Sequence, residues 1–558
     1  MIIKNKEEET FNNPILPGFY PDPSICRVGE DYYMINSSFM YFPGIPIQHS
    51  KDLVHWEQIG HVLDHPSQLN LDGAGFTGGI FAPTIRYHKG VYYVITTNVN
   101  NGGNFIVTAT NPSGPWSDPY WIKRAPGIDP SLFFDEDGRA YYTGTRSPQD
   151  PQYMGDQDIW CQELDLNTMQ LIGESYVLWK GALKNAYFIE GPHLYKINNF
   201  YYLMIAEGGT EHFHSVTISR SKDIFGPYEG NPGNPILTHR HLGKSYPISN
   251  TGHADFVETQ NGEWWMVALA SRPYGGYYKN LARETFLMPM IWEDGWPIVS
   301  PGTGKIEFEY SIPNLTKFDV DSRANRDDFN KETLDYIWNS IRTPRKQFFS
   351  LTERPGNLRL KLRTQGMVDI LKAPPYDESK RLCYKEKETI VDNPSFIGRR
   401  IQHMNFDACT KMEFSPKNDL ETAGIAMVQD NNHQFRFEYS IENGEKIIRL
   451  MKCIAKVDMD FHAKTFSYEN IESKLEQKVF NSQIIYLKVS VRGQDYSFYY
   501  GSSLDSMELL IENVDGRILC SEVAGGCVGT YIGMFASSNG VACDNIADFD
   551  WFEYIGEN

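Results

Sequence analysis

Three acidic residues stand in short motifs that suit carboxyl chemistry: Asp22 in YPDPSI, Asp129 in IDPSLF and Glu190 in IEGPHLY. A carboxylic acid and a carboxylate that face one bond can cleave it with water, because one donates a proton and the other activates the water. Asp, Gly and Pro also punctuate turns for conformational reasons, so a single motif of this kind would indicate only a turn. The chemistry therefore requires a fold that brings the three motifs together.

A repeat built on adjacent aromatic residues can position these motifs. The aromatic pairs are Tyr32-Tyr33, Tyr92-Tyr93, Tyr141-Tyr142, Tyr201-Tyr202 and Trp264-Trp265, separated by 49 to 63 residues. Each pair lies in a short apolar run that follows a turn signal, and another β-like run precedes the turn, which indicates a hairpin. Five such units, with about four short strands each, predict a five-bladed β-propeller. Three further segments echo one another at 49–56, 108–116 and 220–228, and we expect them to be outer strands of blades.

The acidic residues occupy equivalent positions in the repeat. Counting back 10 to 12 residues from each aromatic pair reaches Asp22, Ala82, Asp129, Glu190 and His253. The first strand of each blade lines the central axis, so its start points toward one end of the channel. Three carboxyl groups and one imidazole should therefore converge there, whereas unrelated surface carboxylates would show no such phase.

Carboxyl groups at one end of a channel match the needs of glycoside hydrolysis. An acid protonates the leaving oxygen, and a carboxylate either activates water or attacks the sugar. Asp22 and Glu190 can fill these two roles. Asp129, as a third carboxylate close to the acid, would raise the pKa of that acid by like-charge repulsion and keep it protonated near neutral pH. The residues alone leave inverting and retaining chemistry open.

The acidic motifs, together with GGIFAPTIRYH, EGGTEHFHS, TGHADFVETQNGEWW and ARETFLMP, resemble glycoside hydrolase family 43. The likeness spans nearly the whole chain and is strongest to the two-domain β-xylosidases and α-L-arabinofuranosidases of that family. It implies a single-displacement, inverting mechanism with Asp22 as general base and Glu190 as general acid. Asp129 would modulate the pKa of the acid and orient it.

The resemblance also implies a substrate-binding set: Phe39, Phe81, Arg283 and His253. Phe39 would wall the subsite for the non-reducing sugar, and Phe81 keeps an aromatic ring where the family often has Trp. Arg283 would contact sugar hydroxyls and the region of Asp129. His253 matches a histidine that lies, in relatives, on the propeller axis near a water cluster or a calcium ion. We expect no required cofactor and assign no metal ligand, but a structural Ca²⁺ on the axis near His253 stays open.

The second half of the chain reads as a separate all-β unit. A polar segment at 319–330 breaks the repeat, and alternating apolar and polar residues then predict strands at 358–362, 435–441, 484–491 and 496–501. Many strands of this kind are typical of a β-sandwich. The predicted organisation is a five-bladed β-propeller catalytic domain at 1–318 and a β-sandwich accessory domain at 319–558.

The sandwich domain has a structural or a sugar-binding role as its simplest interpretation, because its sequence offers no acid pair like that of the propeller. By resemblance, its segment 524–535, AGGCVGTYIGMF, closes one side of the pocket. Relatives often have Phe where this chain has Cys527. The sequence therefore leaves open whether this loop caps the site.

The bulk composition argues against several partners. Lys and Arg total 52 against 71 Asp and Glu, a net charge of -19, which disfavours nucleic acid. No apolar run reaches the roughly 18 residues of a membrane span, and the N-terminus lacks the apolar core of a secretion signal. Eight scattered cysteines without a C-x-x-C pair suit reduced thiols rather than disulfides. We therefore expect a cytoplasmic protein with no membrane partner.

The leading hypothesis is an exo-acting hydrolase that releases xylose from the non-reducing ends of short β-1,4-xylo-oligosaccharides. An α-L-arabinofuranosidase, or an enzyme with both activities in one pocket, is the close alternative because the two pentoses expose similar hydroxyls. A non-catalytic sugar-binding propeller and a retaining fructose-releasing or fructose-transferring enzyme are more remote alternatives. The sequence leaves the oligomeric state open, homo-oligomers included.

Overall fold

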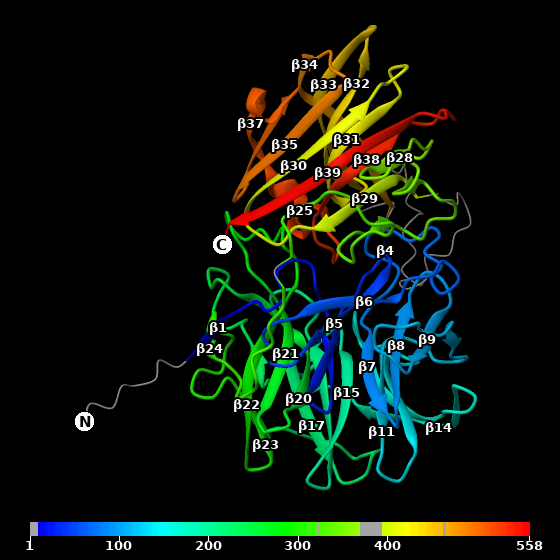
Figure 1. Cartoon of the computed structure of the whole chain (residues 1–558). Helices are drawn as coiled ribbons and strands as arrows, with labels where there is room; N and C mark the ends of the chain where they lie inside the picture. The colour runs from blue at the N-terminus through cyan, green and yellow to red at the C-terminus, as the bar shows by residue number, and fades with distance from the viewer. Residues whose placement is uncertain (1–8, 322, 369–392, 461–464, 558) are drawn as a thin grey trace.

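The computed structural model describes residues 9–321, 323–368, 393–460 and 465–557. Figure 1 shows two bodies, a propeller at the bottom of the view and a layered β-structure at the top. Nearly all regular elements are strands, and the one α-helix in the described ranges is the short α1 (Ser521–Ala524).

Five sheets form the blades of the propeller, and each blade uses one contiguous stretch of sequence. From the first blade to the fifth, their strands are β2 (Ser24–Val28), β3 (Asp31–Ile35), β5 (Gly44–Ser50) and β6 (Glu57–Leu63); β7 (Thr84–His88), β8 (Val91–Asn98), β9 (Gly103–Ala109) and β10 (Tyr120–Trp121); β11 (Ile128–Phe134), β12 (Ala140–Arg146), β13 (Asp158–Asp165) and β14 (Gln170–Trp179); β15 (Glu190–Ile197), β16 (Phe200–Glu207), β17 (Ser215–Ser221) and β18 (Glu229–Gly230), with β19 (Leu237–Thr238) beside β17; and β20 (Ser249–Glu258), β21 (Trp264–Ser271), β22 (Glu284–Glu293) and β23 (Trp296–Val299).

The inner strands β2, β7, β11, β15 and β20 contact one another in a closed ring around the axis. Each aromatic pair lies on the second strand of its blade, where large rings fill the space between neighbouring twisted sheets. Tyr33 of the first blade, for example, meets Tyr92 of the second edge to face, with ring centroids 5.2 Å apart. The predicted five-bladed propeller is confirmed.

The echoing segments proved to be turns more than strands, so that part of the prediction was wrong. Each begins on the last residues of the third strand of its blade and then forms the turn that leads to the fourth strand. In the first blade, the Ser50 hydroxyl accepts from the Leu53 amide at 3.0 Å, and Asp52 accepts from the Val54 amide at 2.9 Å. Side-chain capping of this kind explains why the same polar residues recur.

A clasp ties the two ends of the propeller sequence together. Strand β1 (Thr10–Asn12) pairs antiparallel with β24 (Glu309–Ser311). The Asn13 side chain then mimics a strand partner, because it both donates to the Leu287 carbonyl and accepts from the Leu287 amide at 2.9 Å. No blade contains strands from both ends of the propeller sequence, so these contacts help to hold the ring closed.

The upper body consists of two packed sheets, which confirms the predicted β-sandwich. One sheet contains β25 (Arg326–Asp327), β27 (Phe349–Ser350), β28 (Leu358–Lys361), β30 (Asn405–Phe414), β35 (Ile484–Arg492), β36 (Asp495–Gly501), β37 (Glu508–Asp515) and β39 (Ile546–Glu557), and the other contains β29 (Ser395–Arg400), β31 (Thr422–Asp430), β32 (His433–Glu442), β33 (Glu445–Asp460), β34 (Thr465–Val479) and β38 (Tyr531–Ser537). Side chains such as Phe406, Leu487 and Phe498 alternate inward and are fully buried between the sheets.

The two bodies share an apolar core at one end of the propeller. Tyr41 and Tyr531 stack with ring centroids 3.7 Å apart, and β26 (Ser340–Ile341) pairs with β4 (Tyr41–Phe42) of the propeller half. The boundary expected between residues 318 and 319 falls between β24 and β25, and it stays a prediction. The sandwich is thus packed directly on the propeller rather than tethered to it.

Candidate active site

The inner strands begin with an unusual backbone at the end of the axis that faces the sandwich. Asp22, Asp129 and His253 all adopt positive φ values, of 53°, 52° and 44°. The pairing of β11, β15 and β20 with their neighbours shifts register at the same level. Bulges re-aim side chains, and positive φ in residues other than Gly costs about 1–3 kcal/mol, so such features cluster at functional sites.

Glu190 lies one residue before the position that has this positive-φ backbone in its blade. The residue with the equivalent backbone in the fourth blade is Gly191, with a φ of 56°. A Cβ atom at position 191 would lie 2.9 Å from the imidazole of His253, so a side chain does not fit there. The carboxyl group is therefore supplied from the preceding position.

The structure brings Asp22, Asp129 and Glu190 into electrostatic contact. Asp22 and Asp129 are only 5% and 6% exposed. After burial, the charge of Asp22 raises the pKa of Glu190, and the charges of Glu190 and Asp22 raise the pKa of Asp129. Burial strengthens interactions between charges, so three carboxyl groups at one place cannot all ionise together. Their different partners decide which one keeps its charge.

Asp22 is held as a carboxylate. Arg283 donates from Nη1 to Oδ1 at 2.9 Å, Ser37 donates from its hydroxyl to Oδ2 at 2.6 Å, and the Nδ1 of His253 lies 3.8 Å away. Burial would raise the pKa of Asp22, but Arg283, His253 and the Ser37 hydroxyl outweigh it, and the pKa is lowered. An ionised Asp22 suits the role of a base.

Glu190 has the opposite environment. Burial first, and then the negative charge of Asp22, raise the pKa of Glu190 to about 7, against smaller opposing effects of Arg283 and Gln157. A carboxyl group with this pKa carries a proton near neutral pH and can donate it. The pKa values of the two acids are thus pushed apart, so that Asp22 is ionised and Glu190 is protonated. This is the pattern of a general base and a general acid.

Asp129 behaves differently from the expected charged modulator. Burial, followed by Glu190 and Asp22, raises the pKa of Asp129 well above its ordinary value. The charge that raises the pKa of Glu190 is that of Asp22. Asp129 also accepts a hydrogen bond from the Gly191 amide, directly beside the acid. This contact suits an orienting role, and its role as modulator stays a prediction.

The pKa values predict a pH dependence of catalysis. We expect kcat/KM to fall as pH rises through about 7, because Glu190 then loses the proton that the leaving group needs. The acidic limb should lie below the ordinary range of an aspartate, because the pKa of Asp22 is lowered. Initial rates on a xyloside with a poor leaving group, measured across pH, test this expectation. A rate that stays constant well into the alkaline range would contradict it.

Phe39 and Phe81 form an aromatic wall beside the acids. Their ring centroids lie 5.2 Å apart, and the Arg283 guanidinium lies over the Phe39 ring at 5.5 Å. Arg283 therefore contacts Asp22 and the wall at once. The contacts of these residues with a sugar remain predictions, and the direct bond of Arg283 is to Asp22 rather than to Asp129.

His253 lies on the inner strand β20, against Gly191 and close to Asp22, and its part in substrate binding stays a prediction. Within the described ranges, no group of three or more His, Cys, Asp or Glu side chains is arranged to hold a metal ion. The axial calcium stays a prediction.

The sandwich loop borders the site with its backbone. The Cys527 carbonyl accepts a hydrogen bond from Nη2 of Arg283 at 3.0 Å, so one guanidinium joins the sandwich to Asp22. The Cys527 side chain packs against the apolar cluster that contains Phe39 and Phe81. The loop thus closes one side of the site without an aromatic ring at position 527.

A buried lysine fastens the same loop. Lys279 is 2% exposed, and its Nζ lies 2.9 Å from Glu211 and 2.5 Å from Glu522, the latter in α1 of the sandwich. The Lys279 amide also donates to Glu522 at 3.0 Å. This clamp spans both domains next to Arg283.

Glu522→Ala should lower the free energy of unfolding by about 1–3 kcal/mol, because it leaves a buried lysine with one carboxylate and a main-chain amide without an acceptor. We also expect a lower kcat, since the loop that holds Arg283 loses its anchor. Thermal unfolding and kinetics, with the exposed Glu512→Ala as control, measure both effects. Equal behaviour of the two variants would contradict the clamp.

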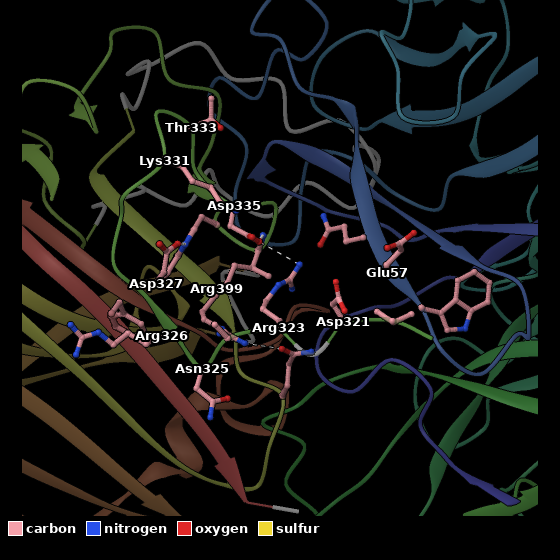
Figure 2. Close-up of a pocket in the computed structure, with 18 of the residues that line it drawn as sticks. Glu57, Asp321, Arg323, Asn325, Arg326, Asp327, Lys331, Thr333, Asp335 and Arg399 are labelled. Atoms are coloured by element: carbon pink, nitrogen blue, oxygen red, sulfur yellow. Dashed lines mark hydrogen bonds and ion pairs between the residues drawn. The ribbon is translucent and has the colours of Figure 1, made fainter. Parts of the chain in front are cut away.

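A separate cavity of about 800 Å³ lies at the junction of the two domains (Figure 2). Its lining includes Glu57 and Arg399, and Arg323 pairs with Asp335 at 3.3 Å within it. The lining contains none of the predicted site residues. Arg283 and Cys527 instead line a much smaller hollow with Glu211. Cavity size alone would therefore misplace the site.

Sequence reasoning missed four contributors: Ser37, Gln157, Lys279 and Glu522. Ser37 lies two residues before Phe39 in the NSSFMYFPG motif. Because Phe39 was predicted as a site residue, the same motif could have pointed to Ser37. Lys279 and Glu522 are 243 residues apart, and their contact leaves no pattern in the sequence.

Comparison with known families assigns both halves of the chain. Residues 11–297 match "Glycosyl hydrolases family 43", and residues 326–555 match the "Beta xylosidase C-terminal Concanavalin A-like domain". The chain therefore belongs to glycosyl hydrolase family 43, and the resemblance inferred from its motifs is confirmed.

Individual relatives cover almost the entire chain. A "Xylosidase/arabinosidase" of Butyrivibrio fibrisolvens is 44% identical over 97% of this chain and 98% of its own length. A "Non-reducing end alpha-L-arabinofuranosidase" of Bacteroides ovatus is 38% identical over 98% of this chain and 95% of its own. The crystal structure of a xylan beta-1,4-xylosidase from Bacillus halodurans superposes with a TM-score of 0.85 at 32% identity, covering 98% of this chain and all of that one.

Proposed function

We propose that this protein is an exo-acting, inverting glycoside hydrolase that releases xylose from the non-reducing ends of short β-1,4-xylo-oligosaccharides. The observation that carries the proposal is the opposite shift of two neighbouring carboxyl groups, with the pKa of Asp22 lowered and that of Glu190 raised to about 7. An acid and a base poised in this way at one end of a propeller axis supply both proton transfers that the reaction needs.

In the proposed mechanism, Asp22 takes a proton from a water molecule as the water attacks the anomeric carbon. Glu190 gives its proton to the glycosidic oxygen as the bond to the leaving sugar breaks. Arg283 and Ser37 keep Asp22 ionised and fix its orientation. Phe39 and Phe81 provide an apolar face for the terminal sugar. In the same step Asp22 gains a proton and becomes neutral, while Glu190 loses its proton and becomes charged, so the next cycle requires proton exchange with solvent.

Release of α-L-arabinofuranose is the second candidate activity, alone or in the same pocket. The relatives that cover the chain carry both names, xylosidase/arabinosidase and non-reducing end alpha-L-arabinofuranosidase. A purely sugar-binding propeller is less well supported, because binding alone does not call for an acid and a base of opposite protonation.

Assays on p-nitrophenyl β-D-xylopyranoside and p-nitrophenyl α-L-arabinofuranoside, together with xylobiose and xylotriose, test the proposal. We expect xylose from both oligosaccharides, with xylobiose as the intermediate product of xylotriose. A higher kcat/KM on the arabinofuranoside and none on xylobiose would replace the first candidate by the second. No turnover of any of the four would refute the enzymatic proposal.

We further place this activity in the cytoplasm, on oligosaccharides short enough to enter a cell. In support, the seven described cysteines are free thiols, which suits a reducing compartment, while Cys383 lies outside the described residues. No helix in the described part of the chain is long and apolar enough to cross a membrane.

A further inference from the structure

A second tier of side chains lies on the propeller axis, two residues beyond the level of Asp22. Its members are Ser24 on β2, Thr84 on β7, Ser131 on β11, His193 on β15 and Asp255 on β20, and all are at most 4% exposed. They continue the fivefold phase of the site into the channel. One of them, Asp255, is a fully buried acid that has no role in the proposed mechanism.

Asp255 is ionised and saturated with donors. Despite burial, the charge of Arg86 and the neighbouring donors lower its pKa to about 2. Its two oxygens accept hydrogen bonds from Ser24 Oγ at 2.9 Å, Ile25 N at 3.1 Å, Arg86 Nη1 at 2.9 Å, Tyr195 Oη at 2.5 Å and Phe256 N at 3.0 Å. A buried carboxylate of this kind requires a nearby cation.

Arg86 supplies that cation from across the channel. Its side chain is 16% exposed, and besides Asp255 its Nη2 lies 2.9 Å from Nδ1 of His193. Because a guanidinium can only donate, Nδ1 accepts and the proton of the neutral imidazole is on Nε2. Strands β7 and β15 belong to blades that are not neighbours, so this contact passes through the central channel.

We infer that the guanidinium of Arg86 is the built-in axial cation of this propeller, and that it takes the place of a structural calcium ion and positions the strands that carry the site residues. Calcium would need six to eight oxygen ligands, but both oxygens of Asp255 already accept from protein donors. While Nδ1 of His193 accepts from Arg86, its Nε2 carries the proton, so neither nitrogen offers a lone pair to a metal ion in this arrangement; Nε2 is buried and has no hydrogen-bond partner among the described residues. A divalent ion beside the guanidinium would also face like-charge repulsion.

The position of the contacts gives Arg86 a link to catalysis. Through Ser24, His193 and Asp255 it ties together β2, β15 and β20. Strand β15 begins at Glu190, β20 contains His253, and β2 begins two residues after Asp22. Arg86 does not touch the reacting atoms, so it is a positioning residue. Loss of its charge should loosen the relative placement of the acid and the base, and misplacement of this kind lowers kcat more than it changes KM.

The first experiment uses the wild-type protein. Dialysis against EDTA should leave both the melting temperature and kcat unchanged, added Ca²⁺ should shift neither, and elemental analysis should find calcium well below one ion per chain. A stoichiometric calcium content, or a chelator-induced loss of melting temperature that Ca²⁺ restores, would overturn the inference whatever the variants do.

The second experiment removes the cation and returns it. Arg86→Ala should lower kcat by about tenfold or more with a smaller change in KM, and methylguanidinium in the buffer should restore part of kcat and of the melting temperature. Arg139→Ala, which removes an exposed arginine paired with Asp137, is the control. Its kcat should equal that of the wild type, and methylguanidinium should change neither its kcat nor its melting temperature. Wild-type kcat in Arg86→Ala would overturn the inference.

Arg86→Lys keeps the charge and covers the event that Arg86→Ala does not fold. It should remain folded and unaffected by EDTA, with kcat between those of wild type and the alanine variant. A kcat that depends on added Ca²⁺ in the wild type, or an Arg86→Lys variant indistinguishable in kcat from wild type, would contradict a positioning role of the guanidinium.

Discussion

Asp22→Ala should lower kcat on xylosides by at least about 10²-fold while leaving the fold intact, because it removes the ionised carboxylate that takes the proton from the attacking water. The neighbours of Asp22 make it unusual: Arg283 and Ser37 donate to its two oxygens and keep it charged. Steady-state kinetics on p-nitrophenyl β-D-xylopyranoside measure the loss, and circular dichroism checks the fold. A variant with near-normal activity would refute the assignment of Asp22 as the base.

Ser37→Ala is the matched control for this prediction. It removes one hydrogen bond to Asp22 and keeps the carboxylate together with its bond to Arg283. Its kcat should therefore fall far less than that of Asp22→Ala. An equal loss in both variants would mean that the effect comes from disturbing this corner of the site, and not from losing a base.

Glu190→Ala should lower kcat by at least about 10²-fold on substrates with a poor leaving group, because the glycosidic oxygen then leaves without a proton. On substrates with an acidic leaving group the loss should be smaller, since such oxygens need little protonation. A series of aryl xylosides with leaving groups of graded pKa measures the difference. The same loss on every member of the series would count against Glu190 as the acid.

The pH profile provides an independent check on Glu190. Its pKa of about 7 sets the alkaline limb of the wild type. Glu190→Gln cannot lose a proton in this range, so this limb should disappear in the residual activity. If the limb persisted in Glu190→Gln, another group would set it, and Asp129, whose pKa is also raised, would be the first to test.

The sequence predicted the propeller well because its signals are local and periodic. Each aromatic pair follows a turn and sits on the second strand of a blade, so the pattern recurs wherever the blade does. The alternation in the second half likewise predicted β28, β32, β35 and β36. The echoing segments misled us, because polar residues that cap a turn recur in a repeat as faithfully as strands do.

The position of the acid was predicted only because the count allowed some tolerance. A strict repeat would have selected Gly191, where the imidazole of His253 leaves no room for a side chain. This contact joins two blades, and it arises only when the fourth and fifth blades pack together. Steric exclusion between blades therefore shifted the carboxyl group by one residue, and nothing in the local motif IEGPHLY reveals this.

The sandwich contribution was the least predictable part of the site. Cys527 acts through its carbonyl, which every residue has, so the residue type gave no signal. Lys279 and Glu522 meet across the two domains, far apart in sequence. The resemblance pointed to this loop, but the contacts of the Cys527 carbonyl and the Glu522 carboxylate could be found only in the folded structure.

The stereochemistry of the first product tests the central claim most directly. If Asp22 activates water while Glu190 protonates the leaving group in one displacement, proton NMR of a β-xyloside reaction should show α-xylose first, with β-xylose appearing later by mutarotation. If β-xylose appeared first, the bond would be cleaved through a covalent intermediate, and a carboxylate would be acting as nucleophile rather than as a base for water.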